Sequence, residues 1–371
     1  MEMPSPLRLV EVFEGIQDWR GRKQTRHKLA EILAVAISAM ISGADDFEAI
    51  AQWGKLKLEW LRTFMPLENG IPSADTFLRV FSILNSKEYE RTFRELAKQY
   101  VPAFQKDQVV AIDGKTSRRS TNKADASPLH LVSAFAADLQ LVLGQTATAE
   151  KSNEITAIPE LLDVLDLKNC IVTIDAMGTQ KKIAQTIRSK EADYVLCVKD
   201  NHPKLAESIL KVHANKKIKP STKFEKSEKN RNRFEERRCW AYSNIDKLNG
   251  YEAWADLSSF AIVERRRTTS DGKTSCEQHL YISSLPADAT RLANSIRKHW
   301  QIENGLHWRL DVQFADDDSR ARTDNAANNL AITRHIALNL LRLYEMPKTS
   351  IKTKRLLVAS SDELRAQVLR L

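Results

Sequence analysis

The chain of 371 residues lacks the patterns that mark disulfide-linked, zinc-binding or membrane proteins. Its longest apolar stretch, residues 29–41, is too short to cross a bilayer, so we interpret it as a core helix and expect no membrane association. No signal peptide is visible, because the acidic Glu2 is not followed by an apolar segment. The cysteines are scattered, with no Cys-x-x-Cys pair, and we expect reduced thiols in a cytoplasmic protein. They are Cys170, Cys197, Cys239 and Cys276.

Positive charge is distributed unevenly along the chain. The net charge is +9, and hydrophobic residues make up 42%, as in a globular protein. Lys and Arg are in excess in residues 201–290 and 319–371, whereas residues 109–200 and 291–318 are nearly neutral. Basic flanks around a neutral centre would attract a polyanion such as nucleic acid. A basic excess that serves only solubility is the alternative.

The spacing of apolar residues changes along the chain and predicts three parts. Residues 1–105 show helical spacing and predict an all-helical module. Residues 106–345 alternate short apolar runs with helical stretches, which predicts an α/β domain with a mixed sheet. Within it, residues 201–290 favour a β-rich antiparallel insertion. Residues 346–371 form a basic C-terminal tail.

The α/β part has the predicted element order β-β-β-α-β-α-β, a meander followed by parallel units. Its strands are expected at 109–113, 129–136, 141–149, 170–175 and 194–199, and its helices at 154–166 and 179–191. In the insertion, strands are expected at 237–242, 259–265 and 278–283. Two more helices follow, at 289–310 and 326–344.

Two aspartates follow apolar runs that read as buried strands. Asp113 ends Val-Val-Ala-Ile-Asp, and Asp175 ends Ile-Val-Thr-Ile-Asp. Neighbouring strands lie roughly 4.8 Å apart, so the two carboxylates converge if these strands pair. Clustered carboxylates repel one another, and a divalent metal ion relieves the repulsion and makes the cluster chemically useful. We therefore predict a metal site where these strands end.

Glu303 is a third acid of interest. A carboxylate on the inward face of a helix is costly unless it is paired or bound to a metal. A salt bridge to Arg297 or Lys298 is the alternative, but together with the two aspartates we favour a metal ligand. Glu303 lies on the same helical stripe as Leu292, Ile296, Trp300, His307 and Leu310.

The loop after Asp113 has the composition of a phosphate-contacting segment, although a solvated loop fits it equally well. A P-loop is excluded because Val109 stands where the motif needs its first glycine. A phosphatase of the haloacid dehalogenase type is disfavoured because Lys115 stands in place of its second aspartate. The candidate phosphate ligands of the loop are Lys115, Arg118, Arg119 and Lys123.

For several polar and aromatic residues the sequence permits both a functional and a structural role. His307, one turn after Glu303, could approach the metal, but a structural hydrogen bond is favoured. Trp300 reads as core more than as a base-stacking platform. Residues 316–318, all aspartate, read as a solvated turn or cap more than as extra metal ligands.

Arginines form two further groups. Residues 265–267, all arginine, end a predicted strand, and the alternation of side chains prevents all three from reaching one ligand. The other group, in the basic C-terminal part, could follow a nucleic-acid backbone and consists of Arg320, Arg322 and Arg334.

Longer motifs surround the three acids. They are Ala-Ile-Asp113-Gly-Lys, Thr-Ile-Asp175-Ala-Met-Gly-Thr-Gln and His-Trp-Gln-Ile-Glu303-Asn-Gly-Leu-His-Trp-Arg-Leu-Asp. The N-terminal module carries Trp19-Arg-Gly-Arg-Lys and Ser73-Ala-Asp-Thr-Phe. Over nearly the whole chain, these motifs resemble the H-repeat-associated transposases of bacterial insertion sequences. This group of DDE transposases has an N-terminal transposase-associated helical domain.

The resemblance implies an RNase-H-like, five-stranded mixed sheet flanked by helices, with Asp113, Asp175 and Glu303 as the catalytic, metal-binding triad. It implies two Mg²⁺ ions per active site, replaceable by Mn²⁺. The implied reaction is phosphodiester cleavage at insertion-sequence ends, followed by strand transfer to target DNA. The implied partners are double-stranded DNA, as element ends and target, and a second copy in a homodimer. Candidate DNA contacts are Lys115, Arg118, Arg119, Lys123, Arg297, His307, Arg309, Arg320 and Arg322.

The chain departs from related transposases at three positions around Glu303. Where those proteins carry Tyr, Arg and Lys, this chain has Ile296, His299 and Leu310, so Arg297 or Arg309 would have to substitute. Two other functions stay open. One is an RNase-H-like nuclease that cleaves without joining, and the other is a catalytically inactive, transposon-derived DNA-binding protein.

Overall fold

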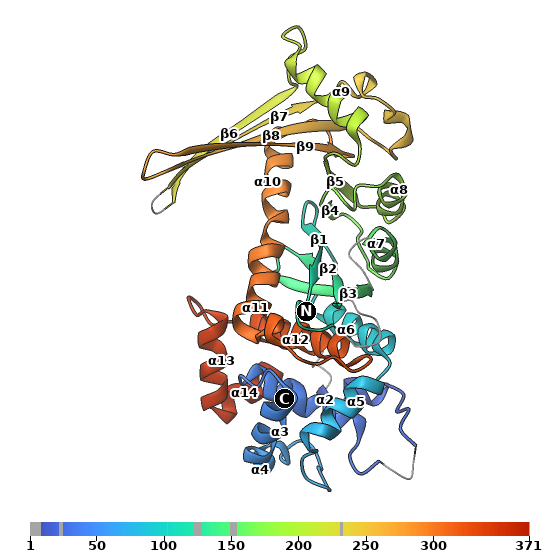
Figure 1. The fold of residues 1–371 in the computed structure, drawn as a ribbon, viewed down its shortest axis with the longest axis vertical. Coiled ribbons are helices and arrows are strands. Elements are labelled where there is room, and N and C mark those ends of the chain that lie inside the picture. Colours follow the sequence, from blue (N-terminus) through green and yellow to red (C-terminus); the bar gives the residue numbers. More distant parts are fainter. Residues whose placement is uncertain are drawn as a thin grey trace.

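The structure is a computed structural model that describes residues 9–21, 25–101, 103–121, 128–148, 154–230 and 233–370. The molecule is elongated, with helices at one end, a twisted sheet in the middle and a long antiparallel ribbon across the other end (Figure 1). It is a mixed α/β protein, as its sequence predicts.

Five strands lie where the sequence predicts them, because each contains a buried apolar run. They are β1 (Val109–Thr116), β2 (His130–Ala136), β3 (Leu141–Thr148), β4 (Ile171–Ile174) and β5 (Asp193–Val198). β1, β2 and β3 form an antiparallel meander, whereas β4 pairs parallel with both β1 and β5. The parallel pair of β1 and β4 is the one that brings the first two acids together.

The insertion continues this sheet and does not form one of its own. Its four strands are β6 (Thr222–Asn230), β7 (Arg233–Tyr242), β8 (Ser259–Thr269) and β9 (Thr274–Ser283). β9 pairs antiparallel with β5, so the sheet has nine described strands in the order β3-β2-β1-β4-β5-β9-β8-β7-β6. The predicted five-stranded sheet is therefore incomplete, because β9 covers the edge of β5 that would otherwise stay unpaired.

Two elements of the insertion region escape the sequence analysis. β6 reads Thr-Lys-Phe-Glu-Lys-Ser-Glu-Lys-Asn, in which only one residue is apolar, so no strand pattern is visible. Helix α9 (Pro203–Ala214) has Pro203 at its first position, where proline's missing N–H costs nothing.

Helices cover both faces of the sheet. On one face α7 (Glu154–Asp163), α8 (Lys181–Ser189) and α9 share an apolar core with the strands. On the other face lie α10 (Ala289–His299) and α12 (Ala326–Leu343), whose core is continuous with that of the N-terminal helices. The predicted helices at 154–166, 179–191 and 326–344 are confirmed.

The described part of residues 1–105 is helical, as predicted. Helix α2 is buried along its whole length and packs against α12, which joins the helical layer to the sheet. In the described ranges no helix is both long and apolar enough to cross a membrane. The helices are α1 (Leu9–Glu14), α2 (Leu29–Ile41), α3 (Phe47–Leu56), α4 (Leu58–Leu61), α5 (Ala74–Ile83) and α6 (Ser86–Tyr100).

Residues 346–371, set apart in the sequence as a basic tail, contain α13 (Ile351–Ser360) and α14 (Asp362–Leu369), which pack against α2. Arg355 is buried and pairs with Asp45 at 2.5 Å. Arg365 is buried as well and lies over the ring of Trp60. Part of the C-terminal positive charge is therefore internal and is not available to a polyanion.

The helix predicted at 289–310 is divided into three parts. α10 is followed by a π-helical turn, η4 (Ile302–His307), and then by α11 (Trp308–Phe314). The core position predicted for Trp300 is wrong, since this side chain is 47% exposed. Residues four apart on an α-helix differ in direction by about 40°. Trp300 comes two such intervals after Leu292, so its side chain points away from the buried stripe.

Candidate active site

Asp113 and Asp175 stand at corresponding positions of two neighbouring parallel strands. Ile112 of β1 is paired with Ile174 of β4, and each aspartate is the next residue along the chain, with Asp113 inside β1 and Asp175 just after β4. The turn after β4 orients the second carboxylate, because Asp175 Oδ1 accepts hydrogen bonds from the N–H groups of Met177 (3.1 Å) and Gly178 (3.3 Å). The sheet thus fixes the backbone of both acids.

The π-helical turn η4 brings Glu303 and His307 to Asp113. His307 Nδ1 lies 3.6 Å from Asp113 Oδ2 and 3.7 Å from Glu303 Oε2. One donor atom from each of these three residues falls within 4.8 Å of the others. Asp113 and His307 are largely shielded from solvent, whereas the Glu303 side chain is 52% exposed. The group therefore opens to solvent on the side of Glu303.

The electrostatics of this group show an excess of negative charge. Burial raises the pKa of Asp113 to about 7, and although His307 opposes the shift, the negative charges of Glu303 and Asp175 add to it. His307 in turn lowers the pKa of Glu303. His307 Nδ1 is shared by the carboxylates of Asp113 and Glu303, and His307 Nε2 has no hydrogen-bond partner among the described residues.

The donor set suits a hard divalent cation. Carboxylate oxygens are preferred ligands of Mg²⁺ and Mn²⁺, and an imidazole is also compatible with Mn²⁺. A cation placed among Asp113, Glu303 and Asp175 would relieve the repulsion that raises the pKa of Asp113. The residues present thus fit a divalent metal ion.

Comparison with protein families gives two adjoining matches. Residues 10–97 match the "DDE_Tnp_1-associated" family, and residues 104–340 match the "Transposase DDE domain" family. "H repeat-associated putative transposase YhhI" of Escherichia coli K12 is 37% identical over 369 residues, which cover 98% of this chain and 97% of that protein. The chain belongs to the H-repeat-associated DDE transposases.

Other similar proteins carry different names. "Putative transposase YncI" of Escherichia coli O157:H7 is 39% identical over 95% of this chain and 91% of that protein. "Inactive transposase YbfQ" of Escherichia coli K12 is 40% identical, but over only 20% of this chain. A solved piggyBac transposase synaptic complex with hairpin DNA is 12% identical, with a TM-score of 0.48, over 98% of this chain and 76% of that one. This last likeness is too weak to indicate a shared fold.

In this DDE transposase a second group of residues shapes η4, and the sequence analysis missed it. A Cβ atom on Gly305 would lie 2.9 Å from Gln140 Oε1 and 3.0 Å from a ring carbon of Phe135, so only glycine allows this approach to the sheet. Arg342 donates hydrogen bonds to the carbonyl oxygens of Gly305 and Gln140. Burial lowers the pKa of Arg342 to about 9. The glycine inside an otherwise helical pattern was the available signal.

Beneath Asp113, a buried pair supports β1. His130 Nε2 lies 2.6 Å from Glu154 Oε1, and both side chains are buried. A Cβ atom on Gly114 would lie 2.2 Å from that same glutamate oxygen, so the glycine after Asp113 is required by packing. No sequence pattern could have joined these residues, because they come from different elements.

His299 occupies one of the three positions at which the chain departs from its relatives. Its Nδ1 lies 3.0 Å from the hydroxyl of Thr173, near Asp175. Burial lowers the pKa of His299 to about 4, although Asp175 and Glu303 oppose the shift. The imidazole is therefore neutral near pH 7 and supplies no cation to the acids.

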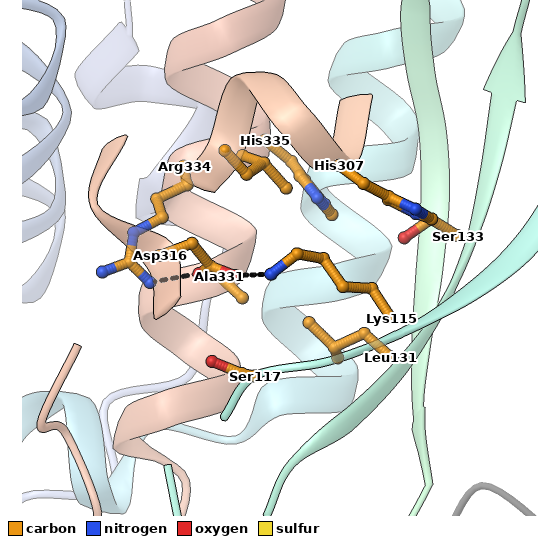
Figure 2. A pocket seen from close by; sticks show the side chains of 10 residues that line it. Lys115, Ser117, Leu131, Ser133, His307, Asp316, Ala331, Arg334 and His335 are labelled. Atoms are coloured by element: carbon orange, nitrogen blue, oxygen red, sulfur yellow. Dashed lines mark hydrogen bonds and ion pairs between the residues drawn. The ribbon is translucent and has the colours of Figure 1, made fainter. Parts of the chain in front are cut away.

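Lys115 is not directed toward the triad. Its ammonium group lies 2.7 Å from Asp311, 2.7 Å from Asp316 and 3.2 Å from Asp317. Figure 2 shows it on one side of Asp316, with Arg334 on the other at 2.8 Å. With three carboxylate partners, this lysine is not free to contact a phosphate.

The same contacts correct two other expectations. Asp316 is buried between two cations, so the interpretation of residues 316–318 as a solvated turn is wrong for this aspartate. Arg334 is 2% exposed and cannot follow a DNA backbone. Its Nη2 also reaches the carbonyl oxygen of Asp45 at 3.4 Å, which ties α12 to the helical layer.

Three other predicted DNA contacts lie close together and have partners within the protein. Arg118 pairs with Asp317 at 3.5 Å, Arg119 pairs with Asp318 at 3.1 Å, and Arg322 donates to the carbonyl of Arg119. Arg320 is exposed. Lys123 lies outside the described residues.

Neither candidate substitute for the missing basic residues lies at the acids. Arg297 bonds with Glu228 of β6, at 3.1 Å, and Arg309 lies over the ring of Trp308. The positions of both arginines are thus explained by partners other than the triad.

Proposed function

We propose that this chain catalyses metal-dependent phosphodiester cleavage at the ends of an insertion sequence and transfers the cut strand to target DNA. The observation that carries the proposal is the meeting of Asp113 and Glu303 beside the end of β4. These two acids are 190 positions apart, and their group carries more negative charge than the surrounding residues neutralise. Membership in the DDE transposase family supports the same reaction.

In this proposal, strands β1–β5 form an RNase-H-like core within a catalytic domain of residues 106–345. Asp113, Asp175 and Glu303 hold two Mg²⁺ ions, for which Mn²⁺ can substitute. Metal bound by these residues would supply Lewis acidity to activate the attacking water or DNA 3′-hydroxyl and to stabilise charge on the leaving oxygen. The π-helical turn holds Glu303 beside Asp113, and the turn after β4 orients Asp175. His307 Nδ1 lies within 4 Å of the carboxylates of Asp113 and Glu303.

The proposed substrate is double-stranded DNA. The net charge of +9 favours a polyanion, and the exposed Arg320, together with Arg118, Arg119 and Arg322, lies in segments that follow Asp113 or α11. A homodimer in the DNA complex stays a prediction.

A cleavage assay on duplexes that end in the element's terminal repeats tests the proposal. The wild-type protein is expected to nick the DNA only with Mg²⁺ or Mn²⁺ and to join pre-cut ends to a second duplex. Glu303→Gln should bind the same DNA and not cut it. Cutting without joining would favour a nuclease, and metal-independent binding without cutting would favour an inactive DNA-binding protein.

A further inference from the structure

Strands β6–β9 form a ribbon that extends beyond the body of the molecule, and α10 runs from this ribbon toward the candidate active site (Figure 1). Side chains alternate between the two faces of a strand. The face that carries Cys239 and Ala241 packs against α10, as shown by their shared core with Leu292 and Ile296. The opposite face carries Tyr242 and packs toward α9.

On the α10 face, three arginines surround one glutamate. Glu235 is 3% exposed, and its carboxylate lies 2.8 Å from Arg237 Nη2 and 2.9 Å from Arg265 Nε. Arg267 Nε is 3.9 Å away and has no hydrogen-bond partner among the described residues. The three arginine side chains are partly exposed, so one buried anion holds several guanidinium groups at an accessible surface.

Two more cations extend this cluster along the same face. Lys226 and Arg297 both pair with Glu228, at 2.8 and 3.1 Å, and both are about half exposed. Glu277 faces Arg265 in the strand register. Five cations thus meet three carboxylates on the α10 face.

The opposite face of the same strands arranges its charges differently. Arg238 contacts three carboxylates, at 2.9 to 3.8 Å, and the other cations in the strand register of this face are Lys223, Lys229 and Arg266. The three carboxylates are Glu225, Glu236 and Glu264. Three arginines therefore share Glu235 on the α10 face, whereas three carboxylates surround Arg238 on the other.

We propose that the α10 face of the ribbon binds the phosphate backbone of double-stranded DNA through Lys226, Arg237, Arg265, Arg267 and Arg297. This inference rests on the proposed function. Arg297 precedes Glu303 by six residues, on the order of 9 Å along a helix, so a duplex at the triad can continue along α10 to the ribbon. Arginine held in a fixed orientation is suited to phosphate, and contacts of this kind position DNA without reading its sequence.

Paired substitutions on the two faces test the inference. Arg265→Gln/Arg267→Gln should weaken binding of a duplex longer than the cleavage site by about tenfold or more. It should also lower the slope of log affinity against log salt concentration by about two. The matched variant Arg238→Gln/Arg266→Gln, with the same residue types in the same ribbon, should leave that slope unchanged. Equal effects of the two pairs would overturn the inference.

The Arg265→Gln/Arg267→Gln variant removes two partners of the buried Glu235 and could unfold the ribbon, so a second variant serves as a check. Lys226→Gln/Arg297→Gln leaves Glu235 paired and should lower the salt slope by about two as well. One possible result is that wild type cleaves DNA with metal while both this variant and Arg265→Gln/Arg267→Gln bind DNA like wild type. That result would refute DNA binding by the ribbon but leave the proposed catalytic function intact. If wild type neither binds nor cleaves the duplex, the proposed function itself fails.

Discussion

In the described part of the molecule, two groups of possible metal-binding side chains meet within 4.8 Å, and they differ in the cations around their acids. Asp311, Asp316 and Asp317 share the ammonium group of Lys115, and Asp316 also binds the guanidinium of Arg334. Near Asp113 and Glu303 lie two imidazoles, His307 and the neutral His299, and Asp175 adds a further negative charge. The first group is neutralised by the protein, and the second is suited to an added metal ion.

Carboxyl pKa values express the same difference. Burial opposes ionisation of Asp316, but Arg334 and Lys115 outweigh it and lower the pKa of this carboxyl. At Asp113 burial raises the pKa to about 7, and the neighbouring acids add to the effect. Proximity of acids is thus a poor guide to a metal site unless the surrounding cations are included.

The largest expected effect is on cleavage. Asp113→Asn or Glu303→Gln should slow DNA cleavage by about 10²- to 10³-fold or more, because each removes a charged metal ligand. DNA binding and thermal unfolding should change little, since neither carboxylate has an ion pair to a Lys or Arg among the residues that the structure describes. Asp317→Asn, in the neutralised group, is the control. Equal losses of activity in all three variants would remove the distinction between the groups.

The neutralised group should instead control stability. Lys115→Met leaves buried carboxylates without one of their cations and should lower the free energy of unfolding by about 3–5 kcal/mol. Denaturant unfolding measures this effect, and Lys123→Met is a control outside the described residues. A midpoint shift no larger than that of the control would show that the lysine does not hold the group together.

A pH dependence should separate the groups further. Folding raises the pKa of Asp113 above its usual 3.8 to about 7, so the folded protein binds more protons than the unfolded chain between these values. In the absence of metal, this carboxyl's contribution to stability should therefore fall as pH rises from about 4 to 7, by up to about 1.4 kcal/mol per unit.

Mg²⁺ should weaken that pH dependence because it favours the ionised carboxylates. The measurement is denaturant unfolding across this range, with and without Mg²⁺, and Asp113→Asn should lose the slope. An identical slope in the wild type and in this variant would contradict the assignment.

The smallest effect is expected at Arg320. This exposed arginine is a proposed DNA contact with no structural role in the fold, so Arg320→Gln should change the free energy of unfolding by no more than about 0.5 kcal/mol. It should lower the salt slope of DNA binding by about one. Arg334→Gln, at a buried arginine of the same segment, should destabilise the protein. The opposite ranking in unfolding experiments would reverse the structural roles given to these two arginines.

The sequence predicts the sheet best where strands are apolar. The runs that end at Asp113 and Asp175 become β1 and β4, because burial on both faces selects apolar residues. The sequence does not predict β6, whose residues are mostly charged or polar, nor the pairing of β9 with the edge of β5. Local composition does not reveal which strands pair when they are far apart in the sequence.

At the site, local patterns indicate the acids but not their environments. Glu303 is expected on an inward apolar stripe, but its side chain is 52% exposed, and the π-helical turn that carries it is marked only by Gly305. Asp316 reads as a solvated acid because its partner Lys115 lies 201 positions away. Whether a buried charge is neutralised depends on tertiary contacts, which the sequence does not display.

Calorimetric titration with Mn²⁺ tests the central claim most directly, because it measures metal binding without DNA. The account predicts that wild type and Asp317→Asn bind the ion with similar affinity, whereas Glu303→Gln binds it at least about tenfold more weakly. Unchanged Mn²⁺ affinity in Glu303→Gln, or loss of binding in Asp317→Asn alone, would contradict a metal site built on Asp113, Asp175 and Glu303.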